Sequence, residues 1–334
     1  MLSPFELWPG TLGTLARTPD RYPGSLRRTT TIQSIWLAPD YRTLLLTARG
    51  RDLLTGADGG AVVTDACQLD LRAVGREKAV QRVVSDPPIP NLHLLEGTKL
   101  SGGFRRTVGT TLAVSPSSVT ALILDDLPAA AFVSAAAPVR AAIEATGHVP
   151  PLALEQRDHP AVCIGHRPEG VMAQRRQEGR PLMGQGPPAG SLVRPDDPLA
   201  WPDDSAPPVH GMRRIRRIDV RVLDGEVLVD THFRDSYREG SGLETVMHEY
   251  EVLARANADE LVVRDIEVRP RVLPGPDCPA AAASAQAVVG SPFEQLRAFV
   301  RAELHDDTVC THLNDQLRSL ADVPRLVETL QRLP

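Results

Sequence analysis

Two cysteines and two histidines in the C-terminal half carry side chains that could do chemistry. Cys310 and His312 lie two residues apart in VCTHLNDQLRSL, Cys278 opens CPAAAASAQAVVG, and His248 lies in VMHEYEVLARA. Thiolate and imidazole groups together suit a transition-metal ion such as zinc. The same groups could form a cysteine nucleophile with a histidine base. Because no tight CxxC pair is present, the pattern also fits buried free cysteines beside ordinary histidines.

The starts of two helices could position these cysteines. If Pro279 is the first helical residue, Cys278 is the N-cap, where the helix dipole and free N–H groups favour a thiolate. On a helix, Cys310 and His312 would point about 200° apart. They converge only where the chain is extended or just entering the helix, as a neighbouring threonine N-cap would arrange.

Two further groups are weaker candidates. The stretch MRRIRRIDVR could receive an acidic ligand or protein partner on Arg213, Arg214, Arg216 and Arg217, since guanidinium forks suit carboxylates and phosphates. A solvated strand in an arginine-biased chain explains the same pattern. The pair formed by Cys163 and His166 has CxxH spacing, but it stands alone in a proline-rich region.

The elements around the site are predicted as strands followed by helices. VMHEYEVLARA and ELVVRDIEVRP alternate as half-buried antiparallel strands do, with Asn257–Asp259 as their hairpin turn. After them, Gly290 would end the helix that starts at Pro279, and Ser291 and Glu294 form a capping-box pattern. Leucines at helical spacing follow. The sequence therefore predicts an α+β fold with helices on one face of an antiparallel sheet.

The two ends of the chain look like copies of one unit. A shift of 183 residues places Ile32 on Ile215 and the RD pair at 51–52 on the pair at 234–235, and a shift of about 190 aligns the late helices. In these registers Cys310, His312 and His248 fall on Thr120, Leu122 and Asp65, and Cys278 falls near Ser85. At these four positions the first copy has no cysteine or histidine, which favours a functional role for those of the second copy.

Composition and length indicate the class of protein. The 334 residues, 42% hydrophobic and 24% charged, suit roughly two globular domains. A net charge of −5 argues against general nucleic-acid binding. No apolar run approaches the roughly 20 residues of a membrane span, no signal peptide is evident, and four cysteines form no disulfide framework, so we expect a cytoplasmic protein.

The connector between the copies is rich in proline, since 12 of the 30 prolines lie in residues 150–208. We therefore predict four segments. They are an extension (1–25), a first α+β half that is a degenerate repeat (26–145), the connector (146–209) and a second α+β half with the site (210–334).

Two resemblances arise at these residues. RRTTTI, PRVLPGPDCPAAA and CTHLNDQLRSLADV resemble a bacterial domain family of unknown function, from about residue 25 onward. The C-terminal half also resembles NifU-like iron–sulfur scaffold proteins in layout. That second resemblance implies a metal site at His248, Cys278, Cys310 and His312. Val246 stands where the scaffold has its first cysteine, and this loss favours a single ion such as zinc over an iron–sulfur cluster.

Overall fold

Alternating apolar residues in both halves form the strands of one sheet. The computed structural model describes residues 7–150, 163–182, 184–202 and 205–332. The strands are β1 (Ser25–Trp36), β2 (Thr43–Thr55), β3 (Ala61–Val74), β4 (Ala79–Asp86), β5 (Met212–Leu223), β6 (Glu226–Arg238), β7 (Glu244–Asn257) and β8 (Val263–Val272).

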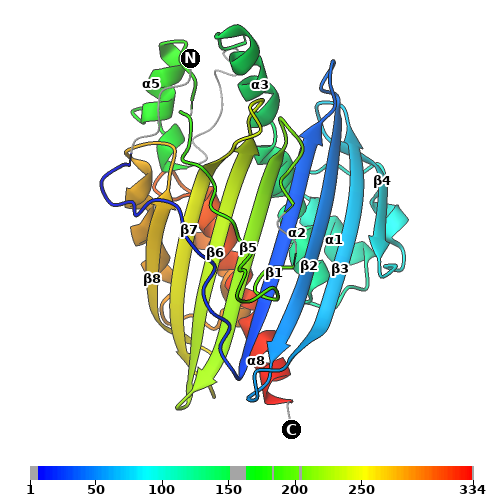
Figure 1. Ribbon diagram of the computed structural model, residues 1–334, viewed down its shortest axis with the longest axis vertical. Helices are drawn as coiled ribbons and strands as arrows, with labels where there is room; N and C mark the ends of the chain where they lie inside the picture. Colours follow the sequence, from blue (N-terminus) through cyan, green and yellow to red (C-terminus); the bar gives the residue numbers. More distant parts are fainter. Residues whose placement is uncertain (1–6, 151–162, 183, 203–204, 333–334) are drawn as a thin grey trace.

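The strand order is β4-β3-β2-β1-β5-β6-β7-β8, and every neighbouring pair is antiparallel. Each half contributes four consecutive strands, and β1 pairs with β5 at the centre (Figure 1). The predicted α+β class is confirmed. The two expected sheets are instead one continuous sheet, because the first strand of each half leaves an edge that the other covers.

Helices follow the strands in each half and cover one face of the sheet (Figure 1). The α-helices are α1 (Phe104–Thr111), α2 (Val119–Val133), α3 (Ala136–Thr146), α5 (Val171–Gln177), α6 (Leu296–Glu303), α7 (Thr311–Ser319) and α8 (Val323–Gln331). The 3₁₀ helices are η1 (Leu92–Leu95), η2 (Ile164–His166), η3 (Cys278–Val288), η4 (Phe293–Gln295) and η5 (Leu320–Asp322). Two large apolar clusters lie between sheet and helices, one for each half.

The segment Val119–Thr146, which spans α2 and α3, is long and apolar enough to cross a membrane by length and composition, with a mean hydropathy of 1.5. The sequence prediction of no such run was therefore too strict. Leu122, Ile123 and Leu127 of α2 are buried against the sheet. Packing of this kind is typical of a core helix, which passes the same test.

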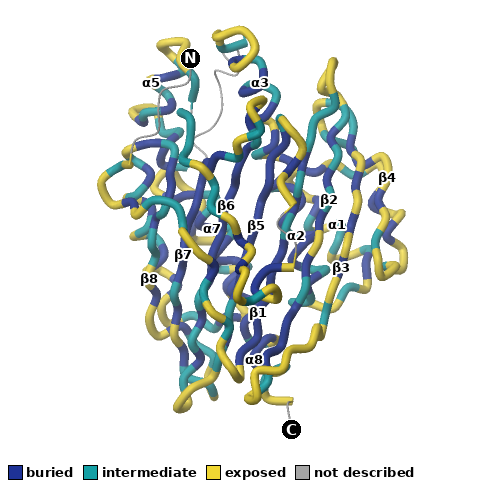
Figure 2. The backbone as a smooth tube through the Cα atoms, viewed as in Figure 1, coloured by how far each residue is buried: buried dark blue, intermediate teal, exposed yellow. Residues whose placement is uncertain are grey.

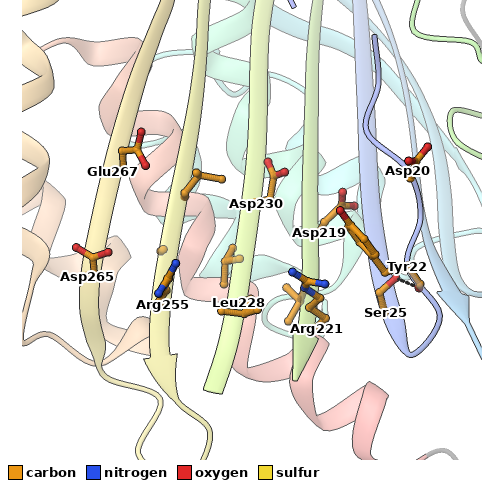
Figure 3. Close-up of a pocket in the computed structure, with 14 residues that line it drawn as sticks. Asp20, Tyr22, Ser25, Asp219, Arg221, Leu228, Asp230, Arg255, Asp265 and Glu267 are labelled. Atoms are coloured by element: carbon orange, nitrogen blue, oxygen red, sulfur yellow. Dashed lines mark hydrogen bonds between the residues drawn. The ribbon is translucent and has the colours of Figure 1, made fainter. Parts of the chain in front are cut away.

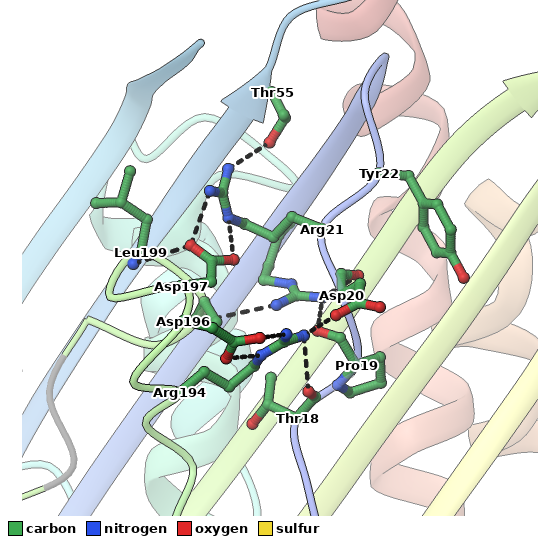
Figure 4. Close-up of polar contacts among 12 residues, drawn as sticks. Thr18, Pro19, Asp20, Arg21, Tyr22, Thr55, Arg194, Asp196, Asp197 and Leu199 are labelled. Carbon is green, nitrogen blue, oxygen red and sulfur yellow. Dashed lines mark hydrogen bonds and ion pairs between the residues drawn. The ribbon is translucent and has the colours of Figure 1, made fainter. Parts of the chain in front are cut away.

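The opposite face of the sheet is crossed by two extended segments, which we call the straps: residues 7–24 and 184–202 (Figures 1 and 2). Ion pairs fasten the straps to each other, as Arg21 binds Asp197 at 2.8 Å and Arg17 binds Asp196 at 2.9 Å (Figure 4). The second strap also joins β7, where the Ala189 N–H donates to the Glu244 carbonyl at 2.8 Å. The second strap belongs to the predicted connector (146–209), so part of the connector covers this face of the sheet.

Local predictions hold for the strands better than for the caps. The β7–β8 hairpin turns after Asn257, whose side chain accepts the Asp259 N–H at 2.8 Å. The segment after Cys278 is a 3₁₀ helix capped by Asp277, so Cys278 is its first residue and not its N-cap. The predicted capping box at Ser291 does not form, because η4 begins after Pro292.

Candidate functional site

Three elements of the second half bring the predicted site residues to one place behind the sheet. His248 lies in β7 on the face that the helices cover, Cys278 is the first residue of η3, and Cys310 is the N-cap of α7. All three are buried. The strand alternation thus places His248 inside the molecule.

Cys310 and His312 point toward each other, as expected where the chain is extended just before it enters a helix. Cys310 has an extended backbone, with φ −117° and ψ 122°, and His312 lies in the first turn of α7. The Cys310 Sγ lies 3.9 Å from the His312 Nδ1. Two zinc ligands at about 2.3 Å for sulfur and about 2.0 Å for nitrogen end roughly 3.6 Å apart at a tetrahedral angle. The pair therefore has nearly the spacing of two ligands of one ion.

The other nitrogen of His312 faces a carboxylate. Its Nε2 lies 3.4 Å from Asp235 Oδ2, and Asp235 is itself held by the Arg214 fork at 2.8 and 3.0 Å. Metal-bound histidines commonly donate their second N–H to such a carboxylate, which fixes the ring and its tautomer. As it stands, the His312 Nε2 is buried and makes no hydrogen bond to any described residue, so this donation would need a rotation of the ring. Sequence reasoning missed Asp235, although its place two residues after Phe233 on the same strand face could have indicated it.

The rings of His248 and His312 are stacked, with centroids 3.6 Å apart and planes 14° from parallel. An imidazole binds a metal along a nitrogen lone pair, which lies in the plane of its ring. No single ion can lie in two nearly parallel planes this far apart. The arrangement therefore argues against the predicted joint ligation of one ion by His248 and His312. The His248 ring instead packs against the His312 ring and restricts its orientation.

Cys163, the N-cap of η2, and His166, its last residue, stood alone in the sequence and lie beside this site. The Cys163 Sγ lies 3.3 Å from the His166 Nδ1. Ile164, which follows Cys163, donates its N–H to the carbonyl of Val309 at 2.9 Å, and Val309 directly precedes Cys310. No spacing rule could have found this approach, since it depends on how the connector folds back.

Burial dominates the protonation of the site. It lowers the pKa of His248 well below the ordinary value, with the charge of His312 as the next cause. Burial, followed by the Arg214 charge, lowers the pKa of His312 to about 3. Both imidazoles are therefore neutral at pH 7, which is the metal-binding form.

The thiols are neutral as well. Burial raises the pKa of Cys310 to about 11, and it raises the pKa of Cys278 further, with Cys310 and Cys163 as added causes. The predicted thiolate at a helix N-cap is therefore not the resting state. A buried neutral thiol is a poor nucleophile, whereas a bound cation would supply the charge that a thiolate needs.

Among the described residues, no three His, Cys, Asp or Glu side chains surround one point closely enough to hold a metal ion as they stand. Binding of an ion would therefore require side-chain rotation.

The four predicted binding arginines lie buried in the central strand β5 (Figure 2). Their forks hold carboxylates of the chain: Arg213 binds Glu244 at 2.8 Å, Arg214 binds Asp235 at 2.8 Å, Arg216 binds Asp126 at 2.9 Å and Arg217 binds Asp230 at 2.7 Å. An acidic ligand or partner for these arginines stays a prediction.

A hollow of about 230 Å³ lies on the strap side of the sheet (Figure 3). Carboxylates such as Asp230 and Glu267 line it together with Arg221 and Arg255. Asp219 at its wall is already bound by Arg27 at 2.7 Å. The mixed charges indicate no single ligand class.

Comparison with known proteins identifies one region of the chain. Residues 212–325 match a family described as Protein of unknown function (DUF2889). These residues form a DUF2889 domain. The domain runs from β5 into α8, so it contains Cys278, Cys310 and His312 but not Cys163.

The match confirms the resemblance to a family of unknown function over a shorter range than expected, which was most of the chain from about residue 25. No curated protein and no solved structure matches the chain significantly. The NifU-like layout therefore stays a prediction.

Proposed function

We propose that the DUF2889 domain holds one transition-metal ion of the zinc class through Cys278, Cys310 and His312. The observation that carries the proposal is the setting of His312, whose Nδ1 faces the Cys310 sulfur at 3.9 Å and whose Nε2 faces the Asp235 carboxylate at 3.4 Å. A sulfur on one side and a carboxylate on the other are the surroundings of a metal-bound imidazole.

The donor set favours zinc over magnesium or calcium, because thiolates and imidazoles are soft or borderline ligands. The buried thiols add support, since binding of a cation would relieve the cost of a buried thiolate. All four cysteines are free, which suits a compartment that keeps thiols reduced. We propose a cytoplasmic location on this ground. An ion held by these residues supports either metal-dependent catalysis or a structural role.

The NifU-like layout supports the same place for the ion. A ligand opens a helix after a strand hairpin at Cys278, and a late helix begins at the Cys310–His312 pair. An iron–sulfur cluster is the less favoured occupant, because such clusters are typically held by four thiolates.

We also propose that the two halves arose by duplication, with the first copy degenerate. The symmetric strand order supports this origin. Asp65 lies opposite Asp52 on β2, as His248 lies opposite Asp235 on β6. When the starts of α2 and α7 are matched, Cys310 corresponds to Ser118, the N-cap of α2. The sequence comparison had matched it to Thr120, two residues later. Ser118 caps its helix through oxygen, where Cys310 presents sulfur.

The test of the metal site is the metal content of the full-length protein. The protein is purified under reducing conditions with added Zn²⁺, excess metal is removed, and zinc, iron and acid-labile sulfide are measured. We expect one zinc ion per chain in the wild type and less than about a tenth of that in Cys310→Ser and Cys278→Ser. Cys67→Ser is the matched control, because Cys67 is an equally buried thiol on β3 of the other half.

Sub-stoichiometric zinc in every sample, with unchanged melting on removal of metal, would contradict the proposal. Iron and sulfide in place of zinc would do so too.

A further inference from the structure

The outer edge of β3 is open along the first half of the strand. β3 runs from Ala61 to Val74, but β4 pairs only with Gln68–Val74 (Figure 1). Within the described residues, no other strand, bridge or backbone hydrogen bond lies along the outer edge of residues 61–67. Unpaired N–H and C=O groups along a strand edge are a template for another strand.

The matching edge in the second half is covered by the chain itself. β8 also falls short of the start of β7, and the second strap completes the edge there as a short antiparallel strand. In that strand Pro188 lies opposite Thr245. Two backbone hydrogen bonds flank this pair: the Val246 N–H donates to the Pro187 carbonyl at 2.9 Å, and the Ala189 N–H donates to the Glu244 carbonyl at 2.8 Å.

The two edges have the same register. Both β3 and β7 carry one extra residue against their inner neighbour, which is Thr64 in β3 and Met247 in β7. The shift of 183 residues that relates the two halves in sequence also relates these two bulges. The pairs on either side of each bulge are Asp52–Asp65 and Leu53–Val63 in the first half, and Asp235–His248 and Ser236–Val246 in the second.

This match indicates which groups of β3 face the open edge. The N–H of Val63 and the carbonyl of Ala61 occupy the places of the two β7 groups that bond the strap. Val62 lies between them, in the place of Thr245. Thr245 is 0% exposed beneath the strap, whereas Val62 is 55% and Val63 is 48% exposed. The first half therefore has the same strand-binding edge with two apolar side chains left in solvent.

The open edge is complementary to a copy of itself. The stretch Gly59–Thr64 contains only glycine, alanine, valine and threonine, so no like charges would meet in a self-pairing. In an antiparallel pairing centred on Val62, the Val63 N–H of each copy donates to the Ala61 carbonyl of the other. These are the same two hydrogen bonds that fasten the strap to β7, and the two Val62 side chains lie directly opposite each other.

The other edge of the sheet offers no such place at the same end of its outer strand. The first strap reaches β8, where the Leu12 and Gly13 N–H groups donate to the Pro270 and Arg271 carbonyls at 3.0 and 2.9 Å. Natural sheets usually blunt an exposed edge with lysine or proline. Neither residue type is present in β3, so its edge has none of these protections.

We propose that the open edge of β3, residues 61–64, binds a second copy of this chain by adding the same strand of that copy, so that two sheets become one. A two-fold axis through Val62 uses both open edges at once, and assembly stops at a dimer. Because the paired segment is short, the dimer is weak, with a dissociation constant on the order of 10 μM.

The first test is the mass of the full-length protein by sedimentation equilibrium, from about 1 to about 200 μM. We expect the mean mass of the wild type to rise from 36.2 kDa toward twice that value. Val62→Lys places two ammonium groups across the axis and should weaken the dimer more than about tenfold. Val222→Lys is the matched control, because Val222 is an exposed valine whose strand is paired on β6, and it should dimerise like the wild type.

The second test places a cross-link at the axis. Val62→Cys is treated with a mild oxidant, and covalent dimers are counted after denaturation without reductant. We expect most of the protein to cross-link, because side chains at directly opposed positions of antiparallel strands lie close enough for a disulfide. Val222→Cys should cross-link at least about tenfold less under the same conditions. Far-UV circular dichroism of each variant confirms that its fold is intact.

Two outcomes would overturn the proposal. A wild-type monomer at every concentration would exclude a second copy as the occupant, and the edge would then suit an extended segment of another protein. A dimer that Val62→Lys leaves unchanged and that Val62→Cys does not cross-link would show association through a different surface.

Discussion

At the scale of residues, the stack of two imidazoles favours His312 over His248 as a ligand of the proposed ion. His312 is enclosed by His248 at 3.6 Å between ring centroids and by Phe233 at 6.0 Å. We expect His248→Phe to retain one zinc ion per chain with an affinity loss below about tenfold, because a flat ring still orients His312. His312→Phe should remove the ion. Zinc titration against a chromophoric chelator measures both, and equal losses in the two variants would restore His248 as a ligand.

The sequence indicated which side chains lie near one another better than it indicated their protonation. Cys310, His312, Cys278 and His248 were singled out by residue type and by their absence from the first half, and the fold brings them to one place. Their protonation was misjudged, because a helix start favours a thiolate only where the dipole outweighs desolvation. Cys163 and Asp235 could not be assigned from spacing, since each reaches the site through a tertiary contact.

At the scale of elements, β1 and β5 are joined by charge as well as by backbone hydrogen bonds. Asp219 of β5 binds Arg27 of β1 at 2.7 Å and also contacts Arg217. Burial alone would raise the pKa of Asp219, but Arg217 and Arg27 bring it below the usual 3.8. Its charge therefore stabilises the folded state fully above about pH 3.8, and this contribution is lost as pH falls toward the lower folded-state value.

We expect Asp219→Asn to lower the free energy of unfolding at pH 7 by about 3 kcal/mol, because two buried arginines lose a counter-charge. The gap to wild type should narrow as the pH falls below about 3.8. Urea unfolding from pH 7 to pH 2.5 measures both values. Asp265→Asn, on the exposed part of β8, is the control. A gap that stays constant with pH would show that the Asp219 charge does not stabilise the fold.

At the scale of the whole molecule, the DUF2889 domain shares its sheet and several buried ion pairs with the first half of the chain. β5 needs β1 on its other side, and Arg28 of β1 binds Asp322 near α8 at 2.8 Å. Arg216 likewise needs Asp126 of α2. We expect residues 210–334 expressed alone to be unfolded or aggregated, as judged by far-UV circular dichroism and sedimentation, and to be rescued by co-expression of residues 1–150. A soluble, cooperatively melting fragment would contradict this expectation.

The sequence predicted the strands and helices, but not the pairing of β1 with β5 that joins them into one sheet. Strand alternation is local, so it marks β7 and β8 well. Nothing local states that the edge of one four-stranded unit will pair with the edge of the other. The arginines of β5 were read as a solvated or ligand-binding strand, because their partners Asp126, Asp235 and Glu244 are distant in sequence or lie on other strands.

The arginines of β5 also bear on which strand can pair with β5. A second molecule that offered its own β5 in place of β1, in the antiparallel register centred on Ile215, would set Arg213 opposite Arg217 and Arg214 opposite Arg216. Like charges directly opposite in a sheet are destabilising. β1 instead brings threonines opposite two of them, as Thr29 faces Arg217 and Thr30 faces Arg216. The central arginines thus favour assembly within one chain over strand exchange between chains.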